Sequence, residues 1–283
     1  MRIQSLEGEH DLVNLCAALN VSWSGYHAWK RRAPGLRARA NAQLWSLIQQ
    51  AHEQSRATYG SPRVHRWLQR HSQRCGRHRV ARLMRDHGLR SQEKRRFRVQ
   101  LTDSNHDLPI APNRLRATPV PARRDAVWVA DITYVDTAEG WLYVAGVLDR
   151  RTRCCVGWAM GDSLATSLPL AALDMALTHR RPAGGLVHHS DRGVQYASDA
   201  YRQRLAAAGV VPSMSRKGNC YDNAATESFW SSLKRELVHR CEFATRAQAR
   251  AVVFEWIEIF YNRERLHSAL GYQSPVDFET QLN

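Results

Sequence analysis

The sequence predicts an α/β protein in which a mixed sheet with flanking helices is preceded by an all-α region. Three observations predict it: helical apolar spacing in the first half, alternating strand-like and helix-like segments in the second, and a proline-containing stretch between them. The 283 residues suffice for a substantial core and for two domains. Charge divides along the same line, because residues 1–125 carry 24 Lys and Arg against 9 Asp and Glu, whereas residues 126–283 carry 17 of each.

Residues 1–35 are predicted to form a short helical segment similar to a helix-turn-helix. Apolar residues at i, i+3, i+4 and i+7 predict a first helix over residues 12–19. Ser22 or Ser24 can cap a second helix, because a serine hydroxyl accepts a hydrogen bond from an unpaired N–H of the first turn. The segment ends at Pro34.

Residues 36–101 are predicted to be a helix-turn-helix DNA-binding region. Ser61 is expected to be an N-cap, with Pro62 in the first turn, and a second helix follows the turn at residues 75–76 and ends at Gly88. An ordinary helical hairpin with solvated arginines is the alternative. Six basic residues on or after the second helix favour DNA: Arg79, Arg82, Arg85, Lys94, Arg95 and Arg96.

Residues 102–125 contain four prolines and are predicted to be an extended linker. The pattern then changes to strands in residues 126–240, where the β-branched and aromatic run 127–135 is typical of a strand buried on both faces. Two antiparallel strands and then alternating helices and strands follow it, an order that a ribonuclease-H-like mixed sheet requires. The further elements are strands at 141–148, 154–160, 186–189 and 210–212, and helices at 164–178, 197–208 and 222–238.

Residues 241–283 are expected to extend this core with one more helix. Thr245 and Gln248 can form a capping box at its start. Phe254, Ile257 and Tyr261 are expected to continue one apolar face of that helix.

The excess of positive charge indicates a partner that is a polyanion. Nucleic acid is favoured over a membrane surface, because the basic residues alternate with helical apolar residues and no run reaches the roughly 18 apolar residues of a spanning helix. The first four residues do not begin a signal peptide, so a cytoplasmic protein is expected. The six cysteines form no CxxC pair, and reduced thiols are the simplest interpretation.

Three acids stand out in the second half of the chain, each in a different predicted element. Asp131 lies within the buried strand, Asp191 follows a short strand, and Glu227 lies on a helix. Taken singly, each has an ordinary explanation: a buried salt bridge, turn chemistry, or a solvated helix face. Three converging carboxylates would repel one another and raise each other's pKa, and hard divalent cations relieve that repulsion. The set therefore predicts metal-dependent chemistry on a phosphodiester, with Lys234 on the helical face of Glu227 placed to reach phosphate oxygens.

Several motifs resemble a known family. Residues 129–143, 189–196 and 221–230 are similar to the catalytic core of insertion-sequence transposases related to retroviral integrases. Residues 59–89 resemble the helix-turn-helix region of the downstream-frame product of the two-frame, IS-three type of element, and residues 261–275 resemble its tail. The resemblance covers nearly the whole chain.

The resemblance implies a DNA transposase or integrase that cleaves DNA strands and transfers them during transposition. It assigns Asp131, Asp191 and Glu227 to a DDE triad that binds two Mg²⁺ (or Mn²⁺) ions, and it matches Lys234 to a basic residue seven positions after the glutamate. The implied partners are double-stranded DNA at the element ends and target, other copies of the chain on DNA, and an upstream-frame product or fusion. The implied location is the nucleoid of a bacterial cytoplasm. A ribonuclease-H-like nuclease without a joining step and a DNA-binding regulator with a silent core are the alternatives.

Overall fold

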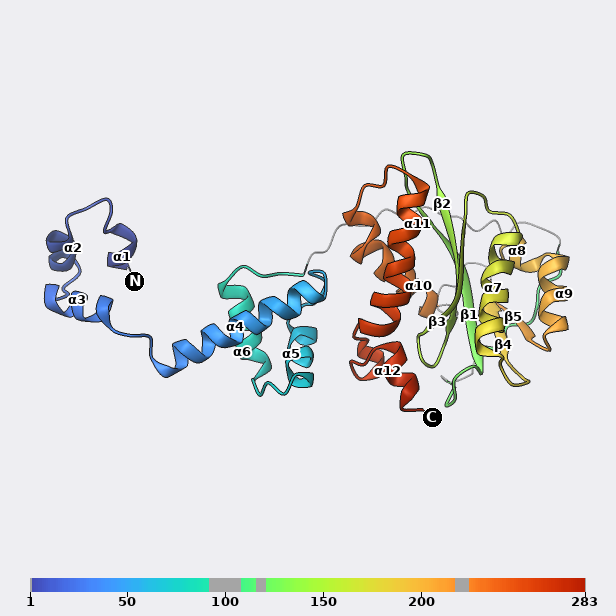
Figure 1. Ribbon diagram of the computed structural model, residues 1–283, viewed down its shortest axis with the longest axis horizontal. Helices are drawn as coiled ribbons and strands as arrows, with labels where there is room; N and C mark the ends of the chain where they lie inside the picture. Colours follow the sequence, from blue (N-terminus) through green and yellow to red (C-terminus); the bar gives the residue numbers. More distant parts are fainter. Residues whose placement is uncertain (1, 92–107, 116–120, 217–223, 283) are drawn as a thin grey trace.

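A computed structural model of the protein describes residues 2–91, 108–115, 121–216 and 224–282 (Figure 1). Its larger part is built on a five-stranded mixed sheet with the strand order β3-β2-β1-β4-β5. β1 is antiparallel to β2 and parallel to β4, β2 is antiparallel to β3, and β4 is parallel to β5. The bounds are Val127–Val135 for β1, Leu142–Asp149 for β2, Cys155–Gly161 for β3, Val187–Ser190 for β4 and Val211–Met214 for β5.

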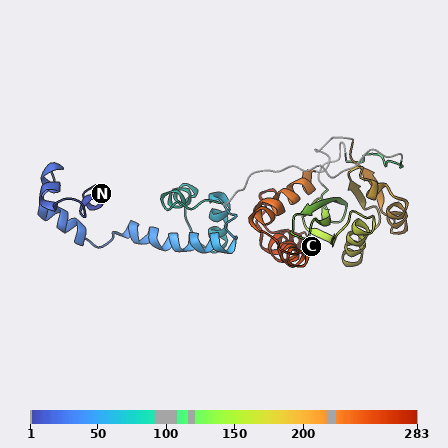
Figure 2. The same cartoon turned by 90° about the horizontal axis from the view of Figure 1, so that it is seen from above.

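Helices cover both faces of this sheet, as Figures 1 and 2 show. Along β1, Val127 and Val129 pack into one core while the alternate residues Trp128 and Ala130 pack into the other, as the two-residue period of a strand requires. α10, α11 and η3 complete the first core, and α7, α8 and α9 complete the second. The bounds are Ser167–Arg180 for α7, Val194–Ala197 for α8, Asp199–Ala207 for α9, Ala224–Glu236 for α10, Arg246–Glu255 for α11 and Trp256–Glu264 for η3.

The predicted mixed sheet and its element order are therefore confirmed. The run of β1 matches its predicted bounds, and the other strands shift by one or two residues. Short elements follow α10 and η3: the 3-10 turns η2 (Val238–Arg240) and η4 (Ser268–Leu270), and the last helix α12 (Pro275–Thr280).

The first part of the chain is all helical, as predicted. It contains α1 (Arg2–Leu6), α2 (Leu12–Ala18), α3 (Trp23–Arg31), α4 (Leu36–Gln54), α5 (Ser61–Arg70) and α6 (Arg77–Asp86). The 19-residue helix α4 was not among the predicted elements. Its buried residues Leu44, Ile48 and Ala51 form a narrow stripe within a mostly polar helix, and they pack with the apolar sides of α5 and α6.

Two local predictions were wrong in detail. The N-cap of α5 is Gly60, so Ser61 is already the first helical residue and makes no side-chain cap. Phe254 is 48% exposed although Ile257 and Tyr261 are buried. The helix widens into a π-helix at Trp256, and this change of period moves Tyr261 off the face of Phe254.

The capping box at α11 forms in a modified way. Thr245 Oγ1 accepts from the N–H of Gln248 at 3.1 Å, as predicted. The side-chain oxygen Oε1 of Gln248 accepts from the N–H of Ala244, one residue before the cap, at 3.0 Å.

The helical region contacts the C-terminal part of the chain. The Tyr59 hydroxyl accepts a hydrogen bond from the Leu266 N–H at 2.8 Å, and Leu266 packs into the core that α4, α5 and α6 share. Arg70 on α5 pairs with Asp277 on α12 at 2.6 Å. Within the described ranges, no helix is long and apolar enough to cross a membrane.

Candidate active site

The pairing of β1 with β4 sets the position of the first two acids. The parallel register joins Val127 to Val187 and Val129 to His189, residues that differ by 60 in number. Asp131 and Asp191 differ by the same 60 positions and lie two residues beyond the last of these pairs. Because neighbouring strands run about 4.8 Å apart, the two carboxylates come to one level at the end of β4.

Asp131 is a half-buried carboxylate in the middle of the sheet. Burial and then the charge of Asp191 raise its pKa to about 8, and Glu227 adds to the shift more weakly. The N–H of Ile132, which donates to Oδ1 at 2.8 Å, and the cation of Lys234 act in the opposite direction. The other three predicted site residues, Asp191, Glu227 and Lys234, therefore all act on the pKa of Asp131.

Asp191 is held by the turn that leads from β4 into α8. Its Oδ1 accepts from the N–H of Gly193 at 2.9 Å. A Cβ at Gly193 would lie 3.1 Å from that same oxygen and 3.1 Å from Gln195 Oε1. The glycine therefore leaves room for the carboxylate to fold back on its own turn.

Glu227 lies on α10, and the packing of this helix against the sheet depends on a glycine. Gly146 on β2 is the cross-strand partner of Asp131. The indole of Trp230 occupies the space where a Cβ of Gly146 would be, with ring carbons only 2.9 and 3.0 Å from that position. α10 thus approaches the sheet directly beside Asp131, and Glu227 is an exposed residue one turn before Trp230.

Lys234 lies seven residues after Glu227 on the same helix. Its Nζ is 4.1 Å from the centroid of the Tyr134 ring, a cation–π contact. Burial lowers the pKa of Lys234, and Asp131 acts to raise it. The lysine is therefore fixed over β1, three residues further along the strand than Asp131.

The donor chemistry of this site suits a hard divalent cation, since Asp131 and Asp191 are carboxylates whose repulsion a cation would relieve. Within the described ranges, no group of three or more His, Cys, Asp or Glu side chains is close enough to hold a metal ion. The charge of Glu227 also raises the pKa of Asp131, so this glutamate acts on the same carboxylate as Asp191.

The basic residues predicted to contact DNA differ in their surroundings. Arg85 is exposed, whereas Arg82 is half-buried and Arg79 donates from Nε to Asn41 Oδ1 on α4 at 2.9 Å. Of these three arginines, Arg85 alone is exposed. Lys94, Arg95 and Arg96 lie outside the described residues.

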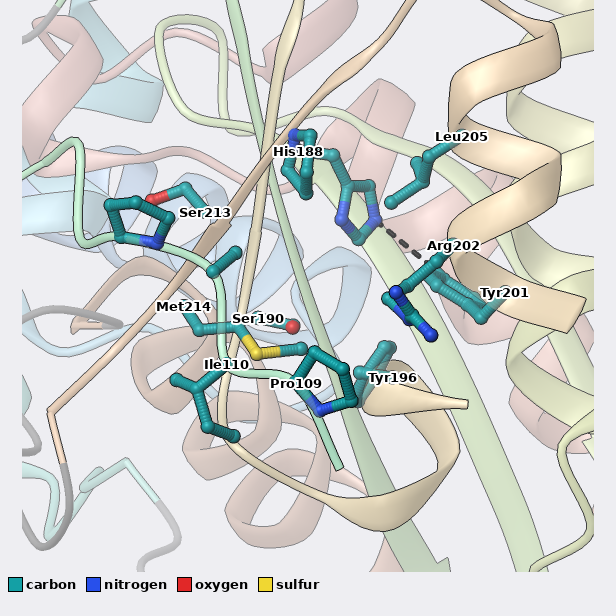
Figure 3. Close-up of a pocket in the computed structure, with 13 residues that line it drawn as sticks. Pro109, Ile110, His188, Ser190, Tyr196, Tyr201, Arg202, Leu205, Ser213 and Met214 are labelled. Carbon is teal, nitrogen blue, oxygen red and sulfur yellow. Dashed lines mark hydrogen bonds between the residues drawn. The ribbon is translucent and has the colours of Figure 1, made fainter. Parts of the chain in front are cut away.

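A cavity of about 220 Å³ lies on the far side of β4 from Lys234, and Figure 3 shows its lining. Pro109 and Ile110 of segment 108–115 form one side of it. Burial and the neighbouring His189 lower the pKa of His188 to about 3, so its ring is neutral at pH 7. The Tyr201 hydroxyl lies 3.1 Å from His188 Nε2, and the two groups share a hydrogen bond. The cavity lies next to the turn that carries Asp191, because Ser190 and Tyr196 line it.

Gly146, Trp230 and Tyr134 were not among the predicted site residues. Their part in the site follows from cross-strand pairing and helix packing, and neither is visible in residue spacing along the chain. The signal for Gly146 in the sequence is a glycine inside a predicted strand, which often marks the close approach of another part of the chain.

Comparison with known families agrees with this geometry. Two integrase core domain models match residues 121–220 and 208–275, and an HTH-like domain model matches residues 38–97. A five-stranded mixed sheet with acids on β1, after β4 and on α10 is thus an integrase-type core joined to a helix-turn-helix-like region.

Two relatives cover nearly the whole chain. The "Insertion element IS600 uncharacterized 31 kDa protein" of Shigella sonnei is 47% identical over 95% of this chain and 98% of its own length. "Transposase InsF for insertion sequence IS3A" of Escherichia coli strain K12 is 36% identical over 99% of this chain and 97% of its own length. The chain belongs to the family of IS3-type transposases, which have an integrase-like catalytic core.

Among solved structures, the chain is similar to one in the cryoEM structure of the simian T-cell lymphotropic virus intasome in complex with PP2A regulatory subunit B56 gamma. The TM-score is 0.47 with 13% sequence identity, over 72% of this chain and 67% of that one.

Proposed function

We propose that this transposase cleaves and joins DNA strands through a DDE triad formed by Asp131, Asp191 and Glu227. The observation that carries the proposal is the parallel register of β1 and β4, which brings Asp131 and Asp191 to one level, where the charge of one acts on the other. The raised pKa of Asp131 supports it, because carboxylates that repel one another at one point are suited to a shared cation.

The three acids would hold two Mg²⁺ or Mn²⁺ ions. Bound ions of this kind supply activation of the attacking oxygen and stabilisation of the leaving oxygen in phosphoryl transfer. The turn at Gly193 orients the Asp191 carboxylate, and the close packing of Trp230 on Gly146 orients the helix that carries Glu227. Water and later a DNA 3′-OH are the attacking groups, so no side chain of the protein forms a covalent intermediate.

Lys234 is proposed to contact a phosphate oxygen beside the reacting centre. Its stem is half-buried against Tyr134, so the ammonium group has little freedom to move away from Asp131. A cation fixed in this way stabilises the negative charge that develops on the phosphate.

The first 125 residues are proposed to hold double-stranded DNA at the element ends and target. Arg79, Arg82, Arg85, Lys94, Arg95 and Arg96 are the proposed phosphate contacts, within a helix-turn-helix region of residues 36–101. These 125 residues carry a net charge of +15, which supports a role in holding the DNA phosphates.

Assembly of several copies on DNA and a contribution from an upstream-frame product or fusion complete the proposal. A strand-transfer assay with and without the upstream-frame product tests the second part. An increase in joined product on its addition is expected.

The triad is tested by Mg²⁺-dependent strand transfer with the variants Asp131→Asn, Asp191→Asn and Glu227→Gln. Each is expected to lose activity by at least about 100-fold while remaining folded. Asp162→Asn is the matched control, because Asp162 is an exposed acid at the end of β3. Near-normal activity of any triad variant would remove that residue from the triad.

A second assay separates a transposase from a nuclease. DNA ends that are already nicked and carry a free 3′-OH need only the joining step. Joined product from such ends is expected, and cleavage without any joining would contradict the proposal.

A further inference from the structure

A cavity of about 530 Å³ opens beside Lys234, on the α10 side of the sheet. The end of β1 contributes Tyr134, the following turn contributes Asp136 and Trp141, and the segment after α10 contributes Glu242. The proposed triad leaves this cavity without a role.

Two residues that line the cavity, Tyr134 and Lys234, also lie close to Asp131. Tyr134 lies three residues after Asp131 on β1, and Lys234 rests over its ring at 4.1 Å. Lys234 and Asp131 also influence each other electrostatically. A DNA strand whose phosphate lies at Asp131 and Lys234 would therefore have its next base at the mouth of this cavity.

Trp141 presents an aromatic surface at that mouth. It is 40% exposed, although a tryptophan is usually well covered. Its ring meets the Tyr134 ring edge to face, at a centroid distance of 4.7 Å and an angle of 82°. Its carbonyl accepts from Arg246 Nε at 3.1 Å, so both the backbone and the ring are held in place. An exposed and fixed indole is a stacking platform for a base.

The charges around the cavity select the part of DNA that fits. Asp136 and Glu242 are exposed and line it, and their carboxylates would repel a phosphate backbone. Carboxylates accept hydrogen bonds from the exocyclic amines of bases. Lys234 is on the side of Asp131, where a phosphate is expected. The arrangement therefore suits a base in the cavity and a phosphate outside it.

We propose that this cavity binds one unpaired base of the DNA strand that reacts at Asp131, with the base stacked on Trp141. A base inside a duplex is already stacked between its neighbours, so it would have to leave the duplex to stack on the indole face. This inference rests on the proposed function, because it takes DNA as the substrate and places the reacting phosphate at Asp131 and Lys234.

Fluorescence of 2-aminopurine tests the proposal without any catalysis. The probe is a DNA duplex with a short single-stranded 3′ tail that carries 2-aminopurine, mixed with the full chain in Ca²⁺. Stacking on Trp141 is expected to quench the probe. Trp141→Ala is expected to weaken binding of the tailed DNA by roughly 5- to 100-fold and to leave binding of a blunt duplex unchanged.

Two control variants separate stacking from folding. Trp141→Phe keeps an aromatic face and should retain most of the binding. Phe254→Ala removes another exposed aromatic residue, one that packs on Trp158 at 5.6 Å outside the cavity, and should bind as the unchanged protein does.

The outcomes are distinct from those of the triad assay. Equal binding of tailed DNA by Trp141→Ala and the unchanged protein would overturn the proposal, and so would an equal loss for tailed and blunt DNA. A protein that binds the tail through Trp141 but transfers no strand in Mg²⁺, even with the upstream-frame product present, would instead contradict the proposed strand transfer.

Discussion

Lys234 and Tyr134 form a cation–π pair in which Nζ lies 4.1 Å from the ring centroid, beside the carboxylate of Asp131. The pair joins α10 to the central strand, so the position of the lysine depends on both elements. Such a contact fixes a long side chain that would otherwise be mobile.

Lys234→Gln is expected to lower kcat/KM for strand transfer by roughly 10- to 100-fold, because a charge-assisted contact with phosphate is lost. Lys234→Arg keeps the charge, so its kcat/KM should fall less than that of Lys234→Gln. Measurement of kcat/KM on pre-nicked ends, with thermal unfolding as a check on folding, tests this. Unchanged kcat/KM in the glutamine variant would exclude a phosphate contact.

Gly146→Ala is expected to destabilise the fold by about 1–3 kcal/mol, since the new methyl group meets the indole of Trp230. The displaced α10 should carry Glu227 away from Asp131, so strand transfer should fall as well. Trp230→Phe removes the ring carbons that collide, and the double variant should recover part of both losses.

If the losses of stability in Gly146→Ala and Trp230→Phe simply add in the double variant, the new methyl group does not collide with the indole. Leu173→Ala is the stability control, because Leu173 is buried on the opposite face of the sheet. Leu173→Ala should also destabilise the protein. For the same loss of stability, it should lower strand transfer less than Gly146→Ala does.

Removal of one partner from the buried Arg265–Glu236 pair, at the end of α10, is expected to be strongly destabilising. Arg265 donates to both Glu236 oxygens at 2.8 and 2.7 Å, and only 5% and 10% of the two side chains are exposed. Glu236→Gln leaves a buried cation without its full counter-charge and should cost about 3–5 kcal/mol. The matched control is Asp277→Asn in the exposed pair with Arg70, which should cost less than about 1 kcal/mol. Urea unfolding measures both, and equal costs would contradict this difference.

The metal-free protein is expected to become more stable as the pH falls from about 8 toward 4. In the folded chain the pKa of Asp131 is about 8, against an ordinary value of 3.8, so between these values the folded state holds a proton that the unfolded state releases. Raising the pH through this window therefore removes stability. Thermal unfolding in a chelator across this range measures it.

Asp131→Asn should show a flatter pH dependence and a higher unfolding temperature at pH 8 than the unchanged protein. Mg²⁺ should stabilise the unchanged protein and have less effect on the variant. If the stability of both proteins depends on pH in the same way, a group other than Asp131 causes that dependence.

DNA binding is expected to weaken steeply with salt, because the proposed contacts of residues 1–125 are to phosphates. Arg85→Gln should reduce the slope of log K against log salt by about 1, as expected for one phosphate contact. Arg181→Gln, an exposed arginine at the end of α7, should leave the slope unchanged. Equal slopes for all three proteins would exclude Arg85 from the interface.

Much of the fold could be predicted because its signals are local. The β-branched and aromatic run Val127–Val135 has the bounds of β1, since a nine-residue segment of such residues is typical of a strand covered on both faces. α4 was missed because its buried stripe of three residues is diluted by polar neighbours, and only packing on α5 and α6 stabilises it. The face of Phe254 was assigned wrongly because a change to π-helix follows from tertiary packing and not from propensity.

The sequence by itself determined which acids are available, the 60 positions that separate Asp131 from Asp191, and the confinement of the excess positive charge to the first 125 residues. Tertiary structure decided that this separation matters, because only the parallel register of β1 and β4 brings Asp131 level with Asp191. It also decided how closely α10 approaches, through the absence of a side chain at Gly146, and where Lys234 rests. The physical reason is that register and helix approach are set by contacts between residues far apart in the chain, whereas residue type and spacing are local properties.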